Sequence, residues 1–511
     1  MTETFDLDTA RAVGTNGQVA SPRTTEQLIG AAGMGSGHRP ARGHGYEQRG
    51  LAYLPLSPQY EGRFGRMFRL PPYLPDAERI AEVAALMKED GQGADNPDIP
   101  AGYTYLGQFL DHDITFDPTS SLDRQNDPDG LTNFRSPRFD LDSVYGRGPS
   151  DDPFLYEKAS GGTRMLIGHH DDEDDLPRNT EETALLGDPR NDENIFVSQL
   201  HLTMLKFHNA VVGRLTPDLR RGSETDFEAA QRLVRWHYQW MVLHDFLPRV
   251  VGADLLREVF DDSSGLPVVH RRFYQWRNAP YMPVEFSVAA YRFGHSMIRP
   301  GYKLNTFVPA LPIFTAEPIP DHRLSSFGGF RILPPRWTVE WRRFFEVDGE
   351  GDGPLQQSRL IDSKLADPLA ALPPSVASNP ESLIARNLTR GARLCLPSGQ
   401  AVARHMGVPV LAEDELGLSG PAPLWYYLLK EAEVRAGGRH LGEAGGRIVA
   451  EVFLGLLEKD PSSYLRLDPG FRPFLGPVEG TFGMPDLITV AGHGLGVISG
   501  GIVPPRPVQP V

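Results

Sequence analysis

Apolar residues recur at helical spacing along much of this chain. The stretch DAERIAEVAALMKEDG, from Asp76 to Gly91, combines an acidic start, apolar residues three and four apart and a glycine stop, which predicts a helix. Strand signals are few and short. The same helical spacing predicts further helices that begin near Pro100 and that cover residues 193–215, 226–247 and 282–298.

Two of these predicted helices have distinctive ends or faces. The helix over 226–247 is predicted to be capped by Asp226 and stopped by Pro248. In the helix over 282–298, an apolar stripe runs beside a face with one histidine and two arginines. A lone helical histidine is usually a core residue, but two neighbouring arginines indicate that this face meets an anionic group. The stripe comprises Phe286, Ala289, Ala290, Phe293 and Met297, and the second face Arg292, His295 and Arg299.

The distribution of glycine and proline indicates how the chain is organised. The 511 residues include 46 prolines and 53 glycines, so the segments between helices should be long and irregular. Because no internal repeat or long linker interrupts residues 46–505, we predict one large, mainly α domain there, with few short strands. Residues 1–45 are expected to form a flexible N-terminal extension.

Composition narrows the classes of partner and chemistry. With 51 Lys and Arg against 66 Asp and Glu, the net charge is −15, which argues against nucleic acid or an anionic membrane and favours small-molecule partners. Cys395 is the only cysteine, which excludes an intrachain disulfide and a cysteine metal cluster. No signal peptide is recognised, and the apolar run over 487–503 is too short to span a membrane. We therefore expect a soluble, cytoplasmic protein, although export by another route and the oligomeric state stay open.

Two polar stretches stand out as candidate sites. In the segment from Gly107 to Asp113, Gln108 and His112 share one helix face, and Asp111 and Asp113 flank it at about 100° to either side. Taken alone, the triplet Asp111-His112-Asp113 is more typical of a polar helix face than of a functional site. The acidic run over 171–182, beside two histidines at 169 and 170, is likewise more typical of a solvated charge run than of a metal site.

Four stretches follow one another along the chain: Gly107–Asp113, Gly187–Glu193, Tyr291–Pro300 and Asn387–Arg390. Together they resemble motifs of the animal-type haem peroxidases, the group of myeloperoxidase and, more remotely, the prostaglandin synthases. Gly107–Asp113 resembles the helix of the distal histidine, and Gly187–Glu193 the loop of the catalytic arginine. Tyr291–Pro300 resembles the helix of the proximal histidine, and Asn387–Arg390 the segment that supports it. The resemblance covers roughly residues 100–405. It implies haem b and a peroxidase that reduces hydrogen peroxide and oxidises a halide or small organic donor through a ferryl haem.

The resemblance also assigns roles to individual residues. His295 would be the neutral axial ligand of the iron, with its other ring nitrogen held by Asn387. On the open face His112 would accept a proton from peroxide and return it, and Arg190 would stabilise the developing negative charge. Gln108 is expected to be a third catalytic residue beside this pair, and Arg292 and Arg390 are expected to contact the haem.

Carboxylates matched to the family imply two further features. Asp111 and Glu193 stand where mammalian members form esters with haem, so covalent attachment at both is expected. Asn194 occupies the position of the methionine in myeloperoxidase, so a sulfonium link is not expected. A calcium site is implied by the loop that follows the distal helix, because hydroxyl, carbonyl and carboxylate oxygens suit a hard cation. Its expected ligands are Asp113, Ser136, the Arg138 carbonyl, Asp140 and Asp142.

Three alternatives remain at the level of sequence. A fatty-acid dioxygenase is disfavoured because its radical tyrosine, three residues before the proximal histidine, is replaced by Arg292, and Tyr291 lies about 100° round the helix. A metal hydrolase at His112 lacks a second histidine at ligand spacing. A silent haem-binding protein would need neither His112 nor Arg190. The physiological reductant cannot be deduced from these residues.

Overall fold

The computed structural model describes residues 62–91, 93–116, 133, 135–170, 173–263, 265–276, 280–314, 326–347, 353–373 and 380–492. All belong to one unit, Tyr46–Val511. The expected extension over 1–45 lies outside these residues, as does the end of the apolar run over 487–503. Every helix among the described residues is too short or too polar to traverse a bilayer.

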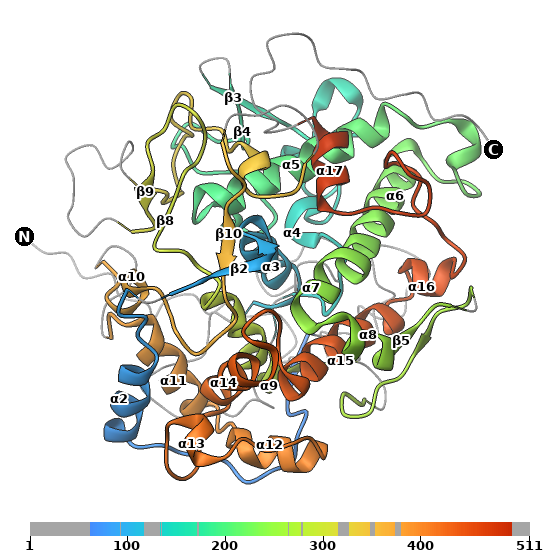
Figure 1. Cartoon of the computed structure of the whole chain (residues 1–511). Coiled ribbons are helices and arrows are strands. Elements are labelled where there is room, and N and C mark those ends of the chain that lie inside the picture. Colours follow the sequence, from blue (N-terminus) through green and yellow to red (C-terminus); the bar gives the residue numbers. More distant parts are fainter. Residues whose placement is uncertain are drawn as a thin grey trace, which may run out of the picture. The chain divides into compact units, whose positions relative to one another are not determined.

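Helices dominate the described residues, so the expected mainly α class is confirmed (Figure 1). The longer helices are α2 (Ala77–Leu86), α3 (Gly102–Ile114), α5 (Ile195–Val212), α6 (Asp226–Met241), α11 (Leu383–Arg393), α12 (Gly399–Met406), α14 (Leu424–Ala436), α15 (Glu443–Lys459) and α17 (Met484–Ala491). Shorter α-helices are α4 (Asp142–Tyr145), α7 (Leu247–Val251), α8 (Ala253–Val259), α9 (Val284–Ser287), α10 (Asp367–Ala370), α13 (Glu413–Leu416) and α16 (Tyr464–Leu467). The 3₁₀-helices are η3 (Pro153–Leu155), η4 (Lys158–Ser160), η5 (Pro189–Asp192), η6 (Pro217–Leu219), η8 (Ala290–His295) and η10 (Trp341–Arg343).

The strands are short and form five two-stranded sheets within the described ranges. The β1–β7 pair is parallel and the other four pairs are antiparallel, with a register irregularity in the β10–β2 pair. None is large enough to provide a core, so the helices supply it. The strands are β1 (Phe64–Gly65), β2 (Asp95–Pro100), β3 (Gly168–His170), β4 (Glu173–Asp175), β5 (Phe260–Asp261), β6 (Val268–Val269), β7 (Met282–Pro283), β8 (Gly301–Tyr302), β9 (Leu311–Pro312) and β10 (Gln357–Arg359).

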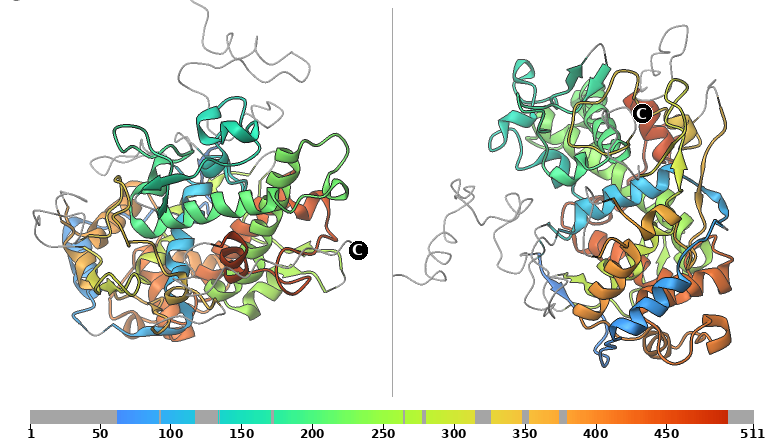
Figure 2. Two further views of the ribbon diagram at one scale, coloured as in Figure 1. Left: turned by 90° about the horizontal axis from the view of Figure 1, so that it is seen from above. Right: turned by 90° about the vertical axis from the view of Figure 1, so that its left-hand side faces the viewer.

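Helix α3 is embedded among the other helices. Ten of its thirteen residues are buried, including His112 and Asp113. It contacts α4, α5 and η8, and the views of Figure 2 show the light-blue helix beside the green α5. A buried helix with this many polar residues does not present an ordinary solvated face, because polar groups in the protein interior need hydrogen-bond partners there. The alternative of a polar surface helix is therefore wrong for this motif.

The helix predicted over 226–247 differs from expectation at both ends. Its N-cap is Thr225, whose hydroxyl and backbone form a capping box with Glu228. Helix α6 ends at Met241, but the chain continues through a π-helical turn, η7 (Val242–Phe246), into α7, which contains Pro248. A proline lacks an amide hydrogen and crowds the preceding turn. The wider π turn accommodates it, so the predicted stop at Pro248 is wrong.

The segment predicted as one helix over 282–298 is broken into two. Helix α9 ends at Ser287, Ala289 adopts φ −127° and ψ −73°, and the 3₁₀-helix η8 follows. Val288 and Gly294 are both weak helix formers, so local propensity does not hold one continuous helix. With three residues per turn, Arg292 and His295 in η8 share one side. The other expected member of that face, Arg299, lies beyond η8 and its Nη1 is 2.7 Å from an Asp95 carboxylate oxygen.

Part of the acidic run after His169 and His170 lies in a β-hairpin. Strands β3 and β4 pair antiparallel, with His169 opposite Asp174. The His169 Nδ1 atom lies 2.6 Å from an Asp174 oxygen on the surface, whereas Asp175 is buried and accepts a hydrogen bond from Arg178. Residues 171–172 lie outside the described residues.

Candidate active site

A cavity of about 470 Å³ separates α3 and the η5 loop from η8 and α11. Apolar side chains such as Phe64, Phe314 and Leu372 share its lining with the polar groups. The structure thus gathers nine expected site residues, from four separate segments, around one space. They are Gln108, Asp111, His112, Arg190, Glu193, Arg292, His295, Asn387 and Arg390.

His112 lies on the α3 side of the cavity with its side chain only 5 % exposed. Its Nδ1 atom is 2.8 Å from Asn191 Oδ1, and its Nε2 atom is 3.6 Å from Glu193 Oε1. Burial, with a further contribution from the Arg190 charge, lowers the pKa of His112 to about 4. The imidazole is therefore neutral at neutral pH and can accept a proton.

Arg190 is held beside His112 by backbone and carboxylate acceptors. Its Nη2 atom donates to the carbonyl oxygens of His112 and Thr115, at 3.1 and 2.6 Å, and to Asp188 Oδ2 at 2.8 Å. The guanidinium also lies over the Phe116 ring, 4.5 Å from its centroid. These contacts fix a cation at the edge of the cavity.

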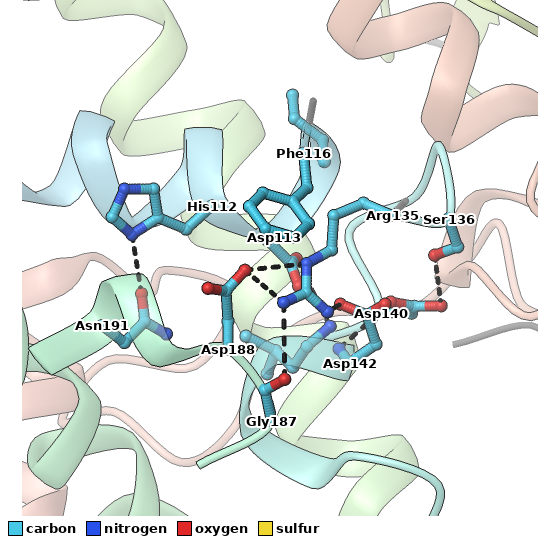
Figure 3. Close-up of polar contacts among 12 residues, drawn as sticks. His112, Asp113, Phe116, Arg135, Ser136, Asp140, Asp142, Gly187, Asp188 and Asn191 are labelled. Atoms are coloured by element: carbon cyan, nitrogen blue, oxygen red, sulfur yellow. Dashed lines mark hydrogen bonds and ion pairs between the residues drawn. The ribbon is translucent and has the colours of Figure 1, made fainter. Parts of the chain in front are cut away.

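Asp188 joins Arg190 to a second buried arginine, Arg135. Arg135 Nε donates to Asp188 at 2.9 Å, and its Nη1 donates to Asp142 at 3.2 Å (Figure 3). Burial alone would raise the pKa of Asp188, but the two guanidiniums outweigh it and hold that pKa well below its ordinary value. Asp188 therefore remains charged and connects the cavity wall to the acidic cluster around Asp142.

Gln108 and Glu193 form a polar pair on the same wall. Gln108 Nε2 donates to Glu193 Oε1, and the Asn194 amide donates to Gln108 Oε1 at 3.2 Å. Burial raises the pKa of Glu193 to about 7. Asp111 also lines the cavity, and its Oδ1 atom accepts from the Thr115 hydroxyl at 2.9 Å. Both carboxyl groups thus border the space that a prosthetic group would fill.

His295 occupies the opposite wall. Its Nδ1 atom is 2.7 Å from the Asn387 amide nitrogen, and its ring lies edge-on to Trp425. Burial, followed by the nearby Arg292 charge, lowers the pKa of His295 to about 3. A neutral imidazole that binds metal through Nε2 carries its proton on Nδ1, so the Asn387 side chain must then present its oxygen to the ring. The two amide orientations occupy the same volume.

Tyr291 links the two walls, a role that the sequence did not reveal. Its hydroxyl donates to the Gly107 carbonyl of α3 at 3.1 Å, and its ring lines the cavity. Arg292, the next residue, donates through Nε to the Ser287 carbonyl at 2.9 Å. The break before η8 rotates this segment so that Tyr291 faces inward.

The expected calcium ligands lie next to the cavity rather than in it. Asp113, Asp140 and Asp142 are buried, and one carboxylate oxygen of each lies within 4.8 Å of the others. Burial raises the pKa of all three, to about 7 for Asp142. Within the described part of the chain, Asp113 Oδ1 and Asp142 Oδ2 have no hydrogen-bond partner. Converging carboxylates with unsatisfied oxygens fit a hard divalent cation.

The other two expected calcium ligands belong to the same loop. The Ser136 hydroxyl donates to Asp140 Oδ2 at 2.9 Å (Figure 3). The Arg138 side chain points to Asp460, with 3.3 Å between Nη1 and Oδ1. Ser136 thus contacts the cluster through Asp140, whereas the Arg138 side chain contacts Asp460.

Sequence reasoning overlooked several partners of these residues. Asp188 and Asn191 stand inside the recognised loop motif, so their position could have drawn notice. His201, on α5, and Arg135 carry no such signal, because a single buried histidine or arginine is not distinguishable from any other by spacing. Their contacts to Asn191 and Asp188 exist only after the chain folds.

Comparison with known proteins agrees with the resemblance. The animal haem peroxidase family profile matches residues 120–319. Thyroid peroxidase of Mus musculus is 25 % identical over 209 residues, 37 % of this chain and 21 % of that protein. Peroxidasin of Drosophila melanogaster is 24 % identical over 314 residues, 59 % of this chain and 18 % of that protein. The chain thus spans about a fifth of the length of these relatives.

Solved structures share the fold. Peroxidase A from Dictyostelium discoideum superposes with a TM-score of 0.60 at 17 % identity, covering 88 % of this chain and 95 % of that one. A fatty acid alpha-dioxygenase of Oryza sativa gives 0.55 at 15 % identity, covering 80 % and 78 %. Identities this low support the fold and no more. Residues 120–319 thus match the animal haem peroxidase family, and the fold of the described residues is that of Peroxidase A.

Proposed function

We propose that this protein is a haem-dependent peroxidase that reduces hydrogen peroxide and oxidises a halide or a small organic donor. One observation carries the proposal: buried imidazoles that are neutral at neutral pH, His112 and His295, stand on opposite walls of a single cavity. One wall offers a ligand and the other a proton acceptor. Haem b, when bound between them, supplies the iron that exchanges electrons with peroxide and donor.

His295 would hold the iron from one side, with Asn387 orienting the ring. Arg292 and Arg390 line the same cavity and would contact the haem periphery, where positive charge suits carboxylate groups. The cavity thus offers both an axial ligand and counter-charges.

On the opposite wall, His112 would take a proton from one oxygen of hydrogen peroxide and deliver it to the other. Its Nε2 atom is the ring nitrogen nearest Glu193, a residue of the cavity lining, while Nδ1 is engaged by Asn191. The Arg190 guanidinium would stabilise the negative charge on the departing oxygen. Gln108 would orient the peroxide or a water beside His112. These residues move and stabilise charge, and the donor then restores the resting state.

Asp111 and Glu193 would form ester bonds with haem, since both carboxyl groups border the cavity. Acidified organic extraction after peroxide treatment tests this. Retained haem, with haem-bearing peptides found at both positions by mass spectrometry, is the expected result. Complete extraction of unmodified haem would exclude the ester bonds and leave the peroxidase proposal unaffected.

Calcium would occupy the acidic cluster beside α3. Its ligands would be Asp113, Asp140 and Asp142, with the Ser136 hydroxyl and the Arg138 carbonyl. A bound cation would neutralise three buried carboxylates and hold the residue next to His112 in place. Metal analysis of the purified protein should find about one calcium per chain on this reading.

A fatty-acid dioxygenase is the second candidate, because two features favour it. The fold neighbours include the dioxygenase of Oryza sativa, and Tyr291 faces the cavity. Against it, Arg292 cannot form a tyrosyl radical. An oxygen electrode with oleate or linoleate separates the two proposals. Sustained oxygen uptake that yields one defined hydroperoxide would favour the dioxygenase.

The main test is the absorption spectrum of the purified protein, followed by peroxide-dependent oxidation of guaiacol. We expect a strong Soret band, and we expect His295→Ala to lose it or shift it. His112→Ala and Arg190→Ala should keep haem and react with peroxide roughly 10²-fold more slowly. His169→Ala is the control, because that histidine is exposed and lies outside the cavity lining. Protein that cannot be loaded with haem would refute the proposal.

A further inference from the structure

Two buried polar side chains extend the hydrogen bonding of His112 away from the cavity. Asn191 Oδ1 is 2.8 Å from His112 Nδ1, and Asn191 Nδ2 is 3.0 Å from His201 Nδ1. Asn191 and His201 are at most 1 % exposed, and neither belongs to the cavity lining. A row of three side chains from α3, η5 and α5 therefore ends at the proton acceptor of the cavity.

We infer that Asn191, oriented by His201, is the positioning residue that keeps the proton of His112 on Nδ1 and leaves Nε2 free to accept. The effect on the reaction with peroxide rests on the proposed peroxidase function, whereas the arrangement of the three side chains rests only on their contacts. A neutral imidazole has one donor and one acceptor nitrogen, and only the surroundings decide which is which.

The Asn191 amide can impose this choice because its two ends are chemically different. Its oxygen only accepts and its nitrogen only donates. With the oxygen toward His112, the Nδ1 atom of that ring must be the donor. If the amide turned over, the Nδ1 atom of His112 would have to accept and its Nε2 atom would carry the proton. Such a ring could not take a proton from peroxide through Nε2.

His201 supplies the reason for one orientation over the other. Its Nδ1 atom lies 3.0 Å from the Asn191 amide nitrogen, and burial lowers the pKa of His201 to about 3, which keeps its ring neutral. In the proposed row His201 carries its proton on Nε2, so that Nδ1 accepts from this amide. A turned amide would place its oxygen against that lone pair, and both ends of the row would be mismatched. Buried mismatches of this kind are costly, so the His201 contact selects the orientation.

Point variants of His201 and Asn191 test the inference in two ways. His201→Leu removes the acceptor, whereas His201→Asn places an amide oxygen near the position of Nδ1. We expect kcat/KM for peroxide to fall roughly tenfold or more in His201→Leu and to recover in His201→Asn, with KM for the organic donor unchanged. A loss that is equal in both variants would mean that His201 merely fills space, and would overturn the inference.

The Asn191→Asp background gives the second test. A carboxylate accepts with either oxygen, so it can receive the His112 Nδ1 proton without guidance from His201. In this background His201→Leu should cause no further loss of rate. A loss of rate as large as in the wild-type background would contradict the proposal that His201 acts on His112 through Asn191. Soret absorbance and melting temperature show which variants are folded, and if His201→Leu fails to fold, the spectroscopic measurement below decides.

Nitrogen NMR of histidine-labelled protein reads the proton position without turnover, because protonated and unprotonated ring nitrogens resonate far apart. The His112 signal is identified by its absence in His112→Gln. Spectra are taken of the ferrous carbonyl protein, which is diamagnetic, or directly if no haem binds. In the latter case the proposed function fails while the inference is still tested. Protonated Nδ1 in the wild type is expected, and protonated Nε2 would overturn the inference.

Discussion

Replacing Asp188 by Asn removes a negative charge that two arginines share. Arg135 Nε and Arg190 Nη2 donate to this carboxylate at 2.9 and 2.8 Å, and the Arg190 backbone amide donates at 2.9 Å. The Arg135 and Asp188 side chains are at most 1 % exposed. An asparagine keeps one acceptor oxygen but turns its amide nitrogen toward a guanidinium, so the variant leaves buried positive charge without compensation.

The expected loss of stability follows from this burial. Breaking a buried ion pair by removing one partner costs about 3–5 kcal/mol. For a unit as long as Tyr46–Val511, the entropy of unfolding is about 1 kcal/mol per kelvin, so the melting temperature should fall by about 3–5 °C. Arg190 would keep its contacts to two backbone carbonyls and to the Phe116 ring but lose its charged partner, and the reaction of the variant with peroxide should slow by roughly 10²-fold.

The assay pairs thermal melting with rapid mixing of the haem-loaded protein and peroxide. Glu340→Gln is a matched control, because Glu340 accepts from Arg343 at 2.6 Å, both side chains are 7 % exposed, and neither lines the cavity. The control should lose comparable stability and keep its rate with peroxide. That contrast separates the placement of Arg190 from a general loss of stability.

The pH dependence gives a second check on Asp188. Its pKa in the folded protein lies below the ordinary value of 3.8, so its contribution to the free energy of unfolding is present above that pH and is lost as the pH falls further. The difference in stability between wild type and Asp188→Asn should therefore shrink below about pH 4. An unchanged rate with peroxide in Asp188→Asn would refute the claim that this carboxylate places Arg190.

Three further predictions concern other parts of the domain. Tyr291→Phe should keep peroxide-dependent guaiacol oxidation within about threefold and lower the melting temperature slightly, because one hydrogen bond of about 1 kcal/mol is lost; abolished turnover would instead give the phenol a chemical role. Asp140→Ala should reduce bound calcium and make the melting temperature insensitive to a chelator, and unchanged metal content would exclude the proposed site. Burial raises the pKa of Glu431 to about 7. The free energy of unfolding of the wild type relative to Glu431→Gln should therefore fall by about 3 kcal/mol as the pH rises from 4.5 to above 7. Denaturant curves that give the same difference between the two proteins at both pH values would contradict this.

Much of the fold and the site could be predicted from the sequence because helical periodicity is local. The prediction over 193–215 appears as α5, and the helix expected near Pro100 appears as α3. The four family motifs were recognisable one by one, since each is a short run of residues whose side chains keep fixed relations along the chain. The mainly α class and the resemblance to the family were thus predictable before any contact was known.

The tertiary structure decided what local patterns could not. The break at Ala289 changes which side chains share a face, and it brings Tyr291 into the cavity while Arg299 pairs with Asp95 instead. Local spacing predicts one continuous helix there, because it registers residues three and four apart and ignores what the segment packs against.

Partnerships across the chain were equally invisible beforehand. His295 meets Asn387 across 92 residues, and Arg135 meets Asp188 across 53. Only the resemblance suggested the first contact, and nothing suggested the second or the row from His201 to His112. Such contacts arise because folding buries charged and polar groups together, and in the low-dielectric interior each must find a partner wherever the chain brings one.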